Sequence, residues 1–121
     1  MAQFGIHASP KRGKAMKSKK IQDDFKNVPA SQGNIRGRVS FAMAGPNTRT
    51  TQMFINTGGN NFLDKQGFTP VGHVTRGMEV VDKINDEYKE QPDQGKIQNK
   101  GNEYLDKNFP RLSYIKSARI V

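Results

Sequence analysis

The chain of 121 residues fits one small domain with a single modest core, so we expect residues 1–121 to form one unit. It has no cysteine and two widely separated histidines, so we expect no disulfide, no metal site and no other cofactor. The net charge of +9 would attract polyanions without specifying one. No apolar run is long enough to span a bilayer and no signal peptide is visible, which favours a soluble, cytoplasmic protein.

The first third of the chain changes character at residue 7. Residues 1–6 are mostly apolar and begin abruptly, as a strand entered partway would. Residues 7–33 are polar, with clustered cations from Lys11 to Lys20 and two prolines, and they predict a surface loop. A solvated loop is the simpler interpretation of the cations, and contact with a nucleic acid or another anionic surface is the alternative.

Two strands are expected in the middle of the chain. Residues 38–44 alternate larger and smaller side chains with the period of a strand, and residues 52–56 predict a second strand after a turn at 45–48. Because strand side chains alternate between faces, Gln52 and Phe54 share one face and Met53 and Ile55 the other. The face that pairs an amide with an aromatic ring is the candidate site, although a half-buried strand with a satisfied amide would show the same pattern.

The last half of the chain predicts four further elements. Residues 69–74, punctuated by Pro and Gly, suit an edge strand. Residues 77–85 predict a short amphipathic helix with Val80, Val81 and Ile84 facing inward. A second short helix is expected between residues 97 and 108, ending before Pro110, and residues 113–121 predict a final strand.

Residues 40–56 resemble the central signature of the cyclophilin-type peptidyl-prolyl cis-trans isomerases, with an Ala-Gly-Pro-Asn turn followed by a Gln-Met-Phe-Ile strand. The motifs at 62–64, 71–74 and 77–84 follow in the order of that family. Residues 1–5, Met-Ala-Gln-Phe-Gly, are similar to the strand that carries its binding glutamine. The tail from residue 92 is longer than in compact cyclophilins and is similar to an extended subgroup.

The resemblance implies a mostly β fold with short helices, in which eight antiparallel strands form a barrel closed by two helices. It also implies that the barrel is incomplete here, because the first strands, the first helix and the strand with the Phe-x-Arg motif have no counterpart in this chain. Residues 1–121 are therefore expected to form a partial cyclophilin-like domain, and a separate N-terminal segment is one expected partner.

The resemblance further implies a face that binds proline-containing peptides and folding proteins. It assigns the proline slot to apolar side chains, peptide hydrogen bonds to two glutamines and the backbone of Met43, and close substrate passage to two alanines. Met43, Phe62 and Phe68 stand where Asn, Trp and His are usual, and each change keeps the slot apolar. The implied substrate-binding residues are Met1, Gln3, Ala42, Met43, Ala44, Gln52, Phe54, Phe62, Leu63 and Phe68.

Isomerisation of an X-Pro bond needs tighter binding of the twisted amide than of either planar form. In the family an arginine supplies the decisive hydrogen bond, and it lies before the residue that matches Met1. Arg36, Arg38 and Arg49 are the substitutes to consider, but the turn around Arg49 matches a family loop remote from that position. No catalytic residue is therefore identified. The resemblance makes isomerisation of X-Pro bonds in folding proteins the leading expectation, with an activity that the missing arginine impairs. A non-catalytic module for proline peptides and a basic nucleic-acid-associated protein are the alternatives.

Overall fold

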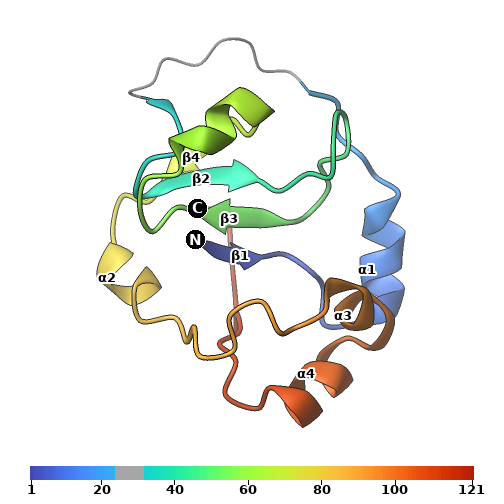
Figure 1. The fold of residues 1–121 in the computed structure, drawn as a ribbon. Helices are drawn as coiled ribbons and strands as arrows, with labels where there is room; N and C mark the ends of the chain where they lie inside the picture. Colours follow the sequence, from blue (N-terminus) through green and yellow to red (C-terminus); the bar gives the residue numbers. More distant parts are fainter. Residues whose placement is uncertain (24–31) are drawn as a thin grey trace.

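The computed structural model describes residues 1–23 and 32–121. Its centre is a four-stranded antiparallel sheet with the order β1-β3-β2-β4 (Figure 1). The strands are β1 (Ala2–Phe4), β2 (Arg38–Phe41), β3 (Met53–Ile55) and β4 (Pro70–His73). The helices are α1 (Pro10–Lys17), the 3-10 helix η2 (Asn61–Gln66), α2 (Met78–Val81), α3 (Gln94–Lys100) and α4 (Asn102–Asn108).

The four strands expected at 1–6, 38–44, 52–56 and 69–74 are confirmed, each in a shorter form. The sheet is antiparallel and accompanied by short helices, as expected, but it is open, with β1 and β4 at its edges. The expected barrel is therefore not closed in this structure, because four short strands are too few to curl into one. None of the helices in the described ranges has the length and apolar character that a membrane crossing requires.

The predicted surface loop at 7–33 is wrong for residues 10–17, which form α1. Pro10 occupies the start of this helix, where its fixed backbone angle and missing N–H are tolerated. The residues after Pro10 are mostly Lys, Arg, Ala and Met, which favour helix. The dense positive charge of this segment favours a loop prediction and obscures the Pro10 start and the helix-favouring residues. Residues 24–31 of the predicted loop lie outside the described residues.

The expected inward stripe of α2 is also wrong, because Val80 is 63% exposed and Ile84 lies beyond the end of the helix, 42% exposed. Only Val81 is half-buried. The helix makes a single turn and is too short to lay a continuous apolar face on the sheet.

The second expected helix is divided into α3 and α4 at Gly101, and α4 ends at Asn108, before Pro110 as predicted. Asp93 begins α3 by accepting a hydrogen bond from the backbone N–H of Lys96 at 2.8 Å. The strand predicted at 113–121 is wrong: these described residues form no strand, and Val121 is fully exposed. Their β propensity is insufficient because no sheet edge pairs with them.

The two faces of the sheet differ in an unexpected way. Phe4, Val39, Phe41, Met53 and Ile55 share one face by register and are all only half-buried. The opposite face holds the most deeply buried side chains, and most of these are polar. Among the described residues, those with less than 2% exposure and the largest volume are Asn34, Ser40 and Asn56.

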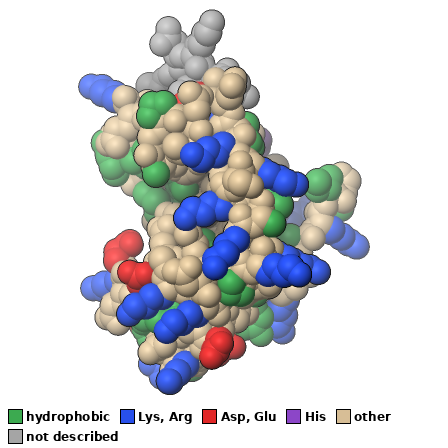
Figure 2. Space-filling view, turned by 90° about the vertical axis from the view of Figure 1, so that its right-hand side faces the viewer, with side chains coloured by type: hydrophobic (Ala, Val, Ile, Leu, Met, Phe, Trp, Pro, Cys, Tyr) green, Lys and Arg blue, Asp and Glu red, His purple; other side chains and the backbone are tan. Residues whose placement is uncertain are grey.

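Positive charge gathers over the side of the molecule that carries α1. There, α1 packs side by side with α3 (Figure 1), and Lys and Arg side chains far outnumber Asp and Glu on this face (Figure 2). The Lys17 ammonium donates a hydrogen bond to Gln98 of α3 at 2.8 Å. The N–H of Asn102 donates to the carbonyl of Ala8 at 3.2 Å, which joins the start of α4 to the segment before α1.

Gly101 makes this close approach possible. Its φ of 63° and ψ of −145° lie in a region that is nearly closed to other residues, and a Cβ atom there would clash with the carbonyl oxygen of Ala8.

We expect Gly101→Ala to lower the free energy of unfolding by about 2–4 kcal/mol, because backbone strain and the clash with Ala8 add together. Urea denaturation measures this change. Gly59→Ala is the matched control, since a Cβ at position 59 meets nothing closer than 3.8 Å, and it should change stability little. Equal effects of the two substitutions would contradict the role assigned to Gly101.

Candidate functional site

Three of the predicted site residues meet across β1 and β3. Gln3 lies directly opposite Phe54 in the register, and alternation places Gln52 on the same face. The Gln3 Nε2 donates to Gln52 Oε1 at 2.9 Å, so the two amides lie side by side next to the aromatic ring. Gln52 Nε2 also reaches Gln94 at the start of α3, over 3.4 Å.

Phe54 is the most deeply buried hydrophobic residue described, at 2% exposed. The edge of Phe68 packs on it, with ring centroids 6.0 Å apart and an interplanar angle of 67°. Leu63 is 9% exposed, and its carbonyl accepts a hydrogen bond from the backbone N–H of Phe68 at 3.3 Å. The Phe54 and Phe68 rings thus pack together, and the backbone joins Leu63 to Phe68, on the face that carries the paired glutamines.

The remaining predicted residues lie around this centre. Ala42 joins it through the backbone, because its N–H donates to the carbonyl of Gln52 at 2.9 Å. The backbone N–H of Ala44 donates to the Thr48 hydroxyl at 2.9 Å, and Met43 is half-buried between the two alanines. Met1 and Phe62 are not enclosed: they are 53% and 61% exposed.

Arg36 and Arg49 are both engaged away from the glutamines. Arg36 donates to the two carboxylate oxygens of Asp82, at 2.9 and 2.6 Å. This hydrogen-bonded pair lowers the pKa of Asp82 and raises the pKa of Arg36. Arg49 is 5% exposed, forms a 3.4 Å ion pair with Asp23 and lies over the ring of Phe41.

Arg38 lies opposite His73 at the end of β2 that is distant from Ala42. Together with Arg36 and His73 it lines a separate shallow hollow. None of the three arginines considered as substitutes is therefore held beside Gln3 and Gln52.

The residues that hold the site were not found by sequence reasoning. The Asn34 side chain uses its full hydrogen-bonding capacity: its Oδ1 accepts from the Ser40 hydroxyl at 2.7 Å and from Asn56 Nδ2 at 3.1 Å. Its Nδ2 donates to Asp64 at 2.7 Å and to the carbonyl of Phe68 at 2.6 Å. Asn34 thus connects β2, the end of β3, η2 and the residue that covers Phe54.

A signal for part of this network was present in the sequence. Asn56 follows Phe54 by two residues, so it lies on the same face, and a polar residue there calls for a buried partner. Asn34 gave no such signal, because it lies between the predicted loop at 7–33 and the predicted strand at 38–44, in a stretch with no periodic pattern.

The same network lowers the pKa of the Asp64 carboxyl. Partial burial would raise the pKa of its carboxyl, but hydrogen bonds from the backbone and side chain of Asn34, and from Asn61, outweigh this effect and lower the pKa.

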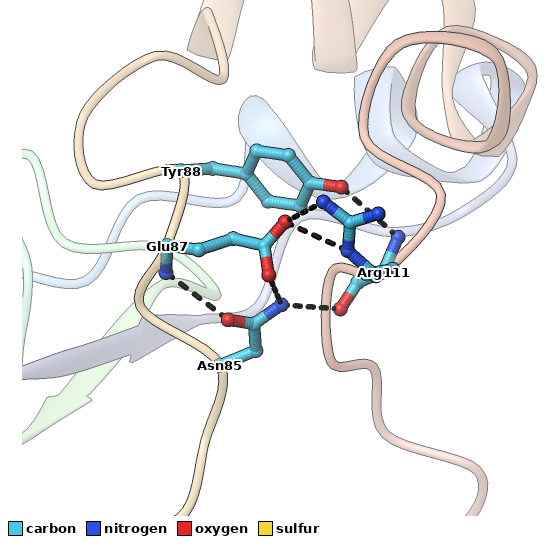
Figure 3. A network of polar contacts seen from close by, with 4 residues as sticks. All are labelled: Asn85, Glu87, Tyr88 and Arg111. Carbon is cyan, nitrogen blue, oxygen red and sulfur yellow. Dashed lines mark hydrogen bonds and ion pairs between the residues drawn. The ribbon is translucent and has the colours of Figure 1, made fainter.

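A second polar cluster lies between the loop after α2 and the C-terminal segment (Figure 3). Glu87 pairs with Arg111, which lowers the pKa of the Glu87 carboxyl, and Asn85 donates to Glu87 at 3.1 Å and to the Arg111 carbonyl at 2.8 Å. The Tyr88 hydroxyl accepts from the Arg111 backbone at 3.2 Å. Because these groups face one another, the cluster fastens the segment after α4 and shows no arrangement for chemistry.

Within the described ranges, no three His, Asp or Glu side chains are grouped so that they could hold a metal ion.

The antiparallel sheet, with paired amides beside a buried aromatic ring, agrees with the class of protein that the motifs indicate. The model of the family described as cyclophilin type peptidyl-prolyl cis-trans isomerase/CLD matches residues 1–102. The chain therefore belongs to the cyclophilin family.

Curated relatives agree with this assignment over part of their length. The chain is 42% identical over 76 residues to a peptidyl-prolyl cis-trans isomerase of Acinetobacter baylyi, covering 57% of this chain and 40% of that protein. It is 36% identical over 85 residues to peptidyl-prolyl cis-trans isomerase-like 3 of Mus musculus, covering 69% of this chain and 51% of the relative. The chain thus spans about half the length, or less, of these relatives.

We expect Asn34→Leu to lower the free energy of unfolding by about 3 kcal/mol or more, because it leaves several buried polar groups without partners. The free energy can be measured by urea denaturation. Asn61→Ala is the control, since Asn61 is exposed and its side chain makes one long hydrogen bond of 3.3 Å, and it should cost under about 0.5 kcal/mol. Comparable losses in both variants would refute the central role of Asn34.

The lowered pKa of Asp64 predicts acid sensitivity. Its stabilising contribution is complete above the unfolded-state pKa of about 3.9 and is lost as the pH falls through the lower folded-state pKa. Asp64→Asn should therefore lose less stability than the parent chain between pH 4 and pH 2, as measured by thermal unfolding. Asp106→Asn, at an exposed position of α4, should follow the parent curve, and the assignment fails if Asp64→Asn follows it too.

Proposed function

We propose that this chain binds X-Pro segments of polypeptides and promotes their cis-trans isomerisation. The observation that carries the proposal is the pair of amides, Gln3 and Gln52, held at 2.9 Å beside the buried ring of Phe54. Rotation about the X-Pro bond makes and breaks no covalent bond, and it is opposed by a barrier of about 18–20 kcal/mol from amide resonance. The protein therefore needs to bind the peptide and to stabilise the twisted amide more than the planar cis and trans forms.

The proposed roles follow from chemistry. Each glutamine side chain has both a donor and an acceptor, and the bond between the two leaves groups that can pair with a peptide backbone. Phe54, Leu63 and Phe68 would surround the proline ring, with the exposed Met1 and Phe62 closing over it. Since Phe54 is almost fully covered, the ring of Phe68 must turn aside when proline enters, and such side-chain rotations are fast.

A non-catalytic module for proline peptides is the second candidate. It is favoured by the engagement of Arg36 with Asp82 and of Arg49 with Asp23. Without a positioned donor for the prolyl nitrogen, the rate enhancement would fall by about a hundredfold or more while binding persisted. Binding and catalysis must therefore be measured separately.

NMR exchange between the cis and trans forms of an Ala-Pro peptide tests both candidates in one sample. Acceleration by the chain supports an isomerase, and peptide-induced shifts of the protein amides without acceleration identify a binding module. Gln3→Ala should weaken peptide binding by about three- to tenfold, the effect of one lost hydrogen bond.

Gln3 is exposed, so its replacement should leave the fold intact. Gln91→Ala, in an exposed turn after α2, is the matched control and should bind as the parent does. The proposal is overturned if a folded chain shows neither peptide shifts nor faster exchange.

A further inference from the structure

A hollow of about 90 Å³ lies between α1, α3 and the loop before β3, and Ile6 and His7 also line it. Lys14 and Lys17 line it from α1, and Gln98 lines it from α3. The two lysines are three residues apart, so they lie on the same face of the helix. The loop contributes Thr50, Thr51 and Gln52 to the opposite wall.

The hollow is suited to a negatively charged group. None of the residues that line it, all within the described part of the chain, carries a carboxylate. The Lys17 ammonium is held by Gln98 at 2.8 Å and keeps two further donors. The ion pairs among the described residues use Arg36, Arg49 and Arg111, so Lys14 and Lys17 have no acidic partner there.

The hollow shares a wall with the candidate peptide site. Gln52 lines it and also accepts the hydrogen bond from Gln3 beside Phe54. A peptide anchored on the two glutamines would therefore pass the mouth of the hollow within a few residues of its proline.

We propose that this hollow selects substrates by accepting an acidic side chain that flanks the X-Pro bond. The inference rests on the proposed function, because the peptide must first dock on Gln3 and Gln52. A carboxylate there meets the ammonium groups of Lys14 and Lys17 together with the Gln98 amide. The lysines belong to α1, so the helix that we did not predict from sequence sets the substrate preference.

A peptide side chain is favoured over a nucleic acid backbone by the shape of the site. The hollow holds one small group and adjoins the slot, whereas nucleic acid binding needs a run of phosphate contacts along a surface. Its lining residues offer one ring, the imidazole of His7, whereas single-stranded nucleic acid binding uses a series of aromatic rings for successive bases.

A series of peptides with a central Ala-Pro tests the proposal. Each peptide carries one glutamate, glutamine or lysine, placed at one of the three positions on either side of that pair. Affinity is measured by NMR titration at low and high salt. At one position, glutamate should bind about three- to tenfold more tightly than glutamine, and lysine more weakly. This preference should shrink in high salt, because the lysines are exposed.

Lys14→Gln combined with Lys17→Gln should abolish the difference between glutamate and glutamine peptides. Lys83→Gln, an exposed lysine next to α2, should preserve it. A preference that persists in the double variant overturns the assignment to this hollow.

Two other outcomes separate the proposals. Equal binding of all peptides, still weakened by Gln3→Ala, overturns the acidic preference and leaves the proposed function standing, whereas no peptide binding overturns both. A single-stranded oligouridine is the second probe. If it binds in a salt-sensitive way that Gln3→Ala does not alter, and glutamate and glutamine peptides bind equally, the substrate role is overturned and the hollow belongs to a surface for nucleic acid.

Discussion

The candidate site depends on one buried side chain, the amide of Asn34. Its four side-chain hydrogen bonds reach Ser40 on β2, Asn56 after β3, Asp64 in η2 and the carbonyl of Phe68. A buried amide is stable only when both its oxygen and its nitrogen are paired, so the partners must take fixed relative positions. These positions place Phe68 against the ring of Phe54 and fix the orientation of η2, which carries Leu63.

This directional constraint compensates for a weak apolar core. Among the residues that the structure describes, Phe54 and Leu63 are the buried hydrophobic ones, whereas Phe41, Met53 and their neighbours on the opposite face remain half-exposed. Burial of apolar surface has no preferred geometry, and little of it is achieved here. The hydrogen bonds of Asn34 and Asn56 provide the specificity that close packing provides in larger domains, and they do so on the face that carries the candidate site.

The parts that could be predicted from the sequence depend on local periodicity. Alternation along β3 placed Gln52 and Phe54 on one face, and the structure pairs Gln3 with both. Asn34 could not be recognised in this way, because Asn56 and Asp64, two of its partners, lie 22 and 30 residues away. Its role appears only when the chain is folded.

The predictions that proved wrong also have physical causes. α1 lies in the segment predicted to be a loop, because the dense positive charge of that segment obscures its helix-forming residues and the Pro10 start signal. Residues 113–121 have the composition of a strand, but strand formation needs a partner edge, which composition does not report. Gly101 falls inside the span predicted as one helix, and local periodicity does not reveal its close approach to Ala8, which sets the position of α3 and α4.

The proposed proline slot and the hollow beside α1 are held by separate constraints, and this separation determines what the lysines can contribute. Asn34 fixes the slot, whereas Gly101 and the Lys17–Gln98 bond fix the helices around the hollow. A carboxylate bound by Lys14 and Lys17 would lie away from the rotating amide, so it would interact equally with the cis, trans and twisted forms. Such uniform binding lowers KM without raising kcat. The hollow would therefore decide which peptides are held, while the rate of isomerisation would still depend on a donor at the prolyl nitrogen.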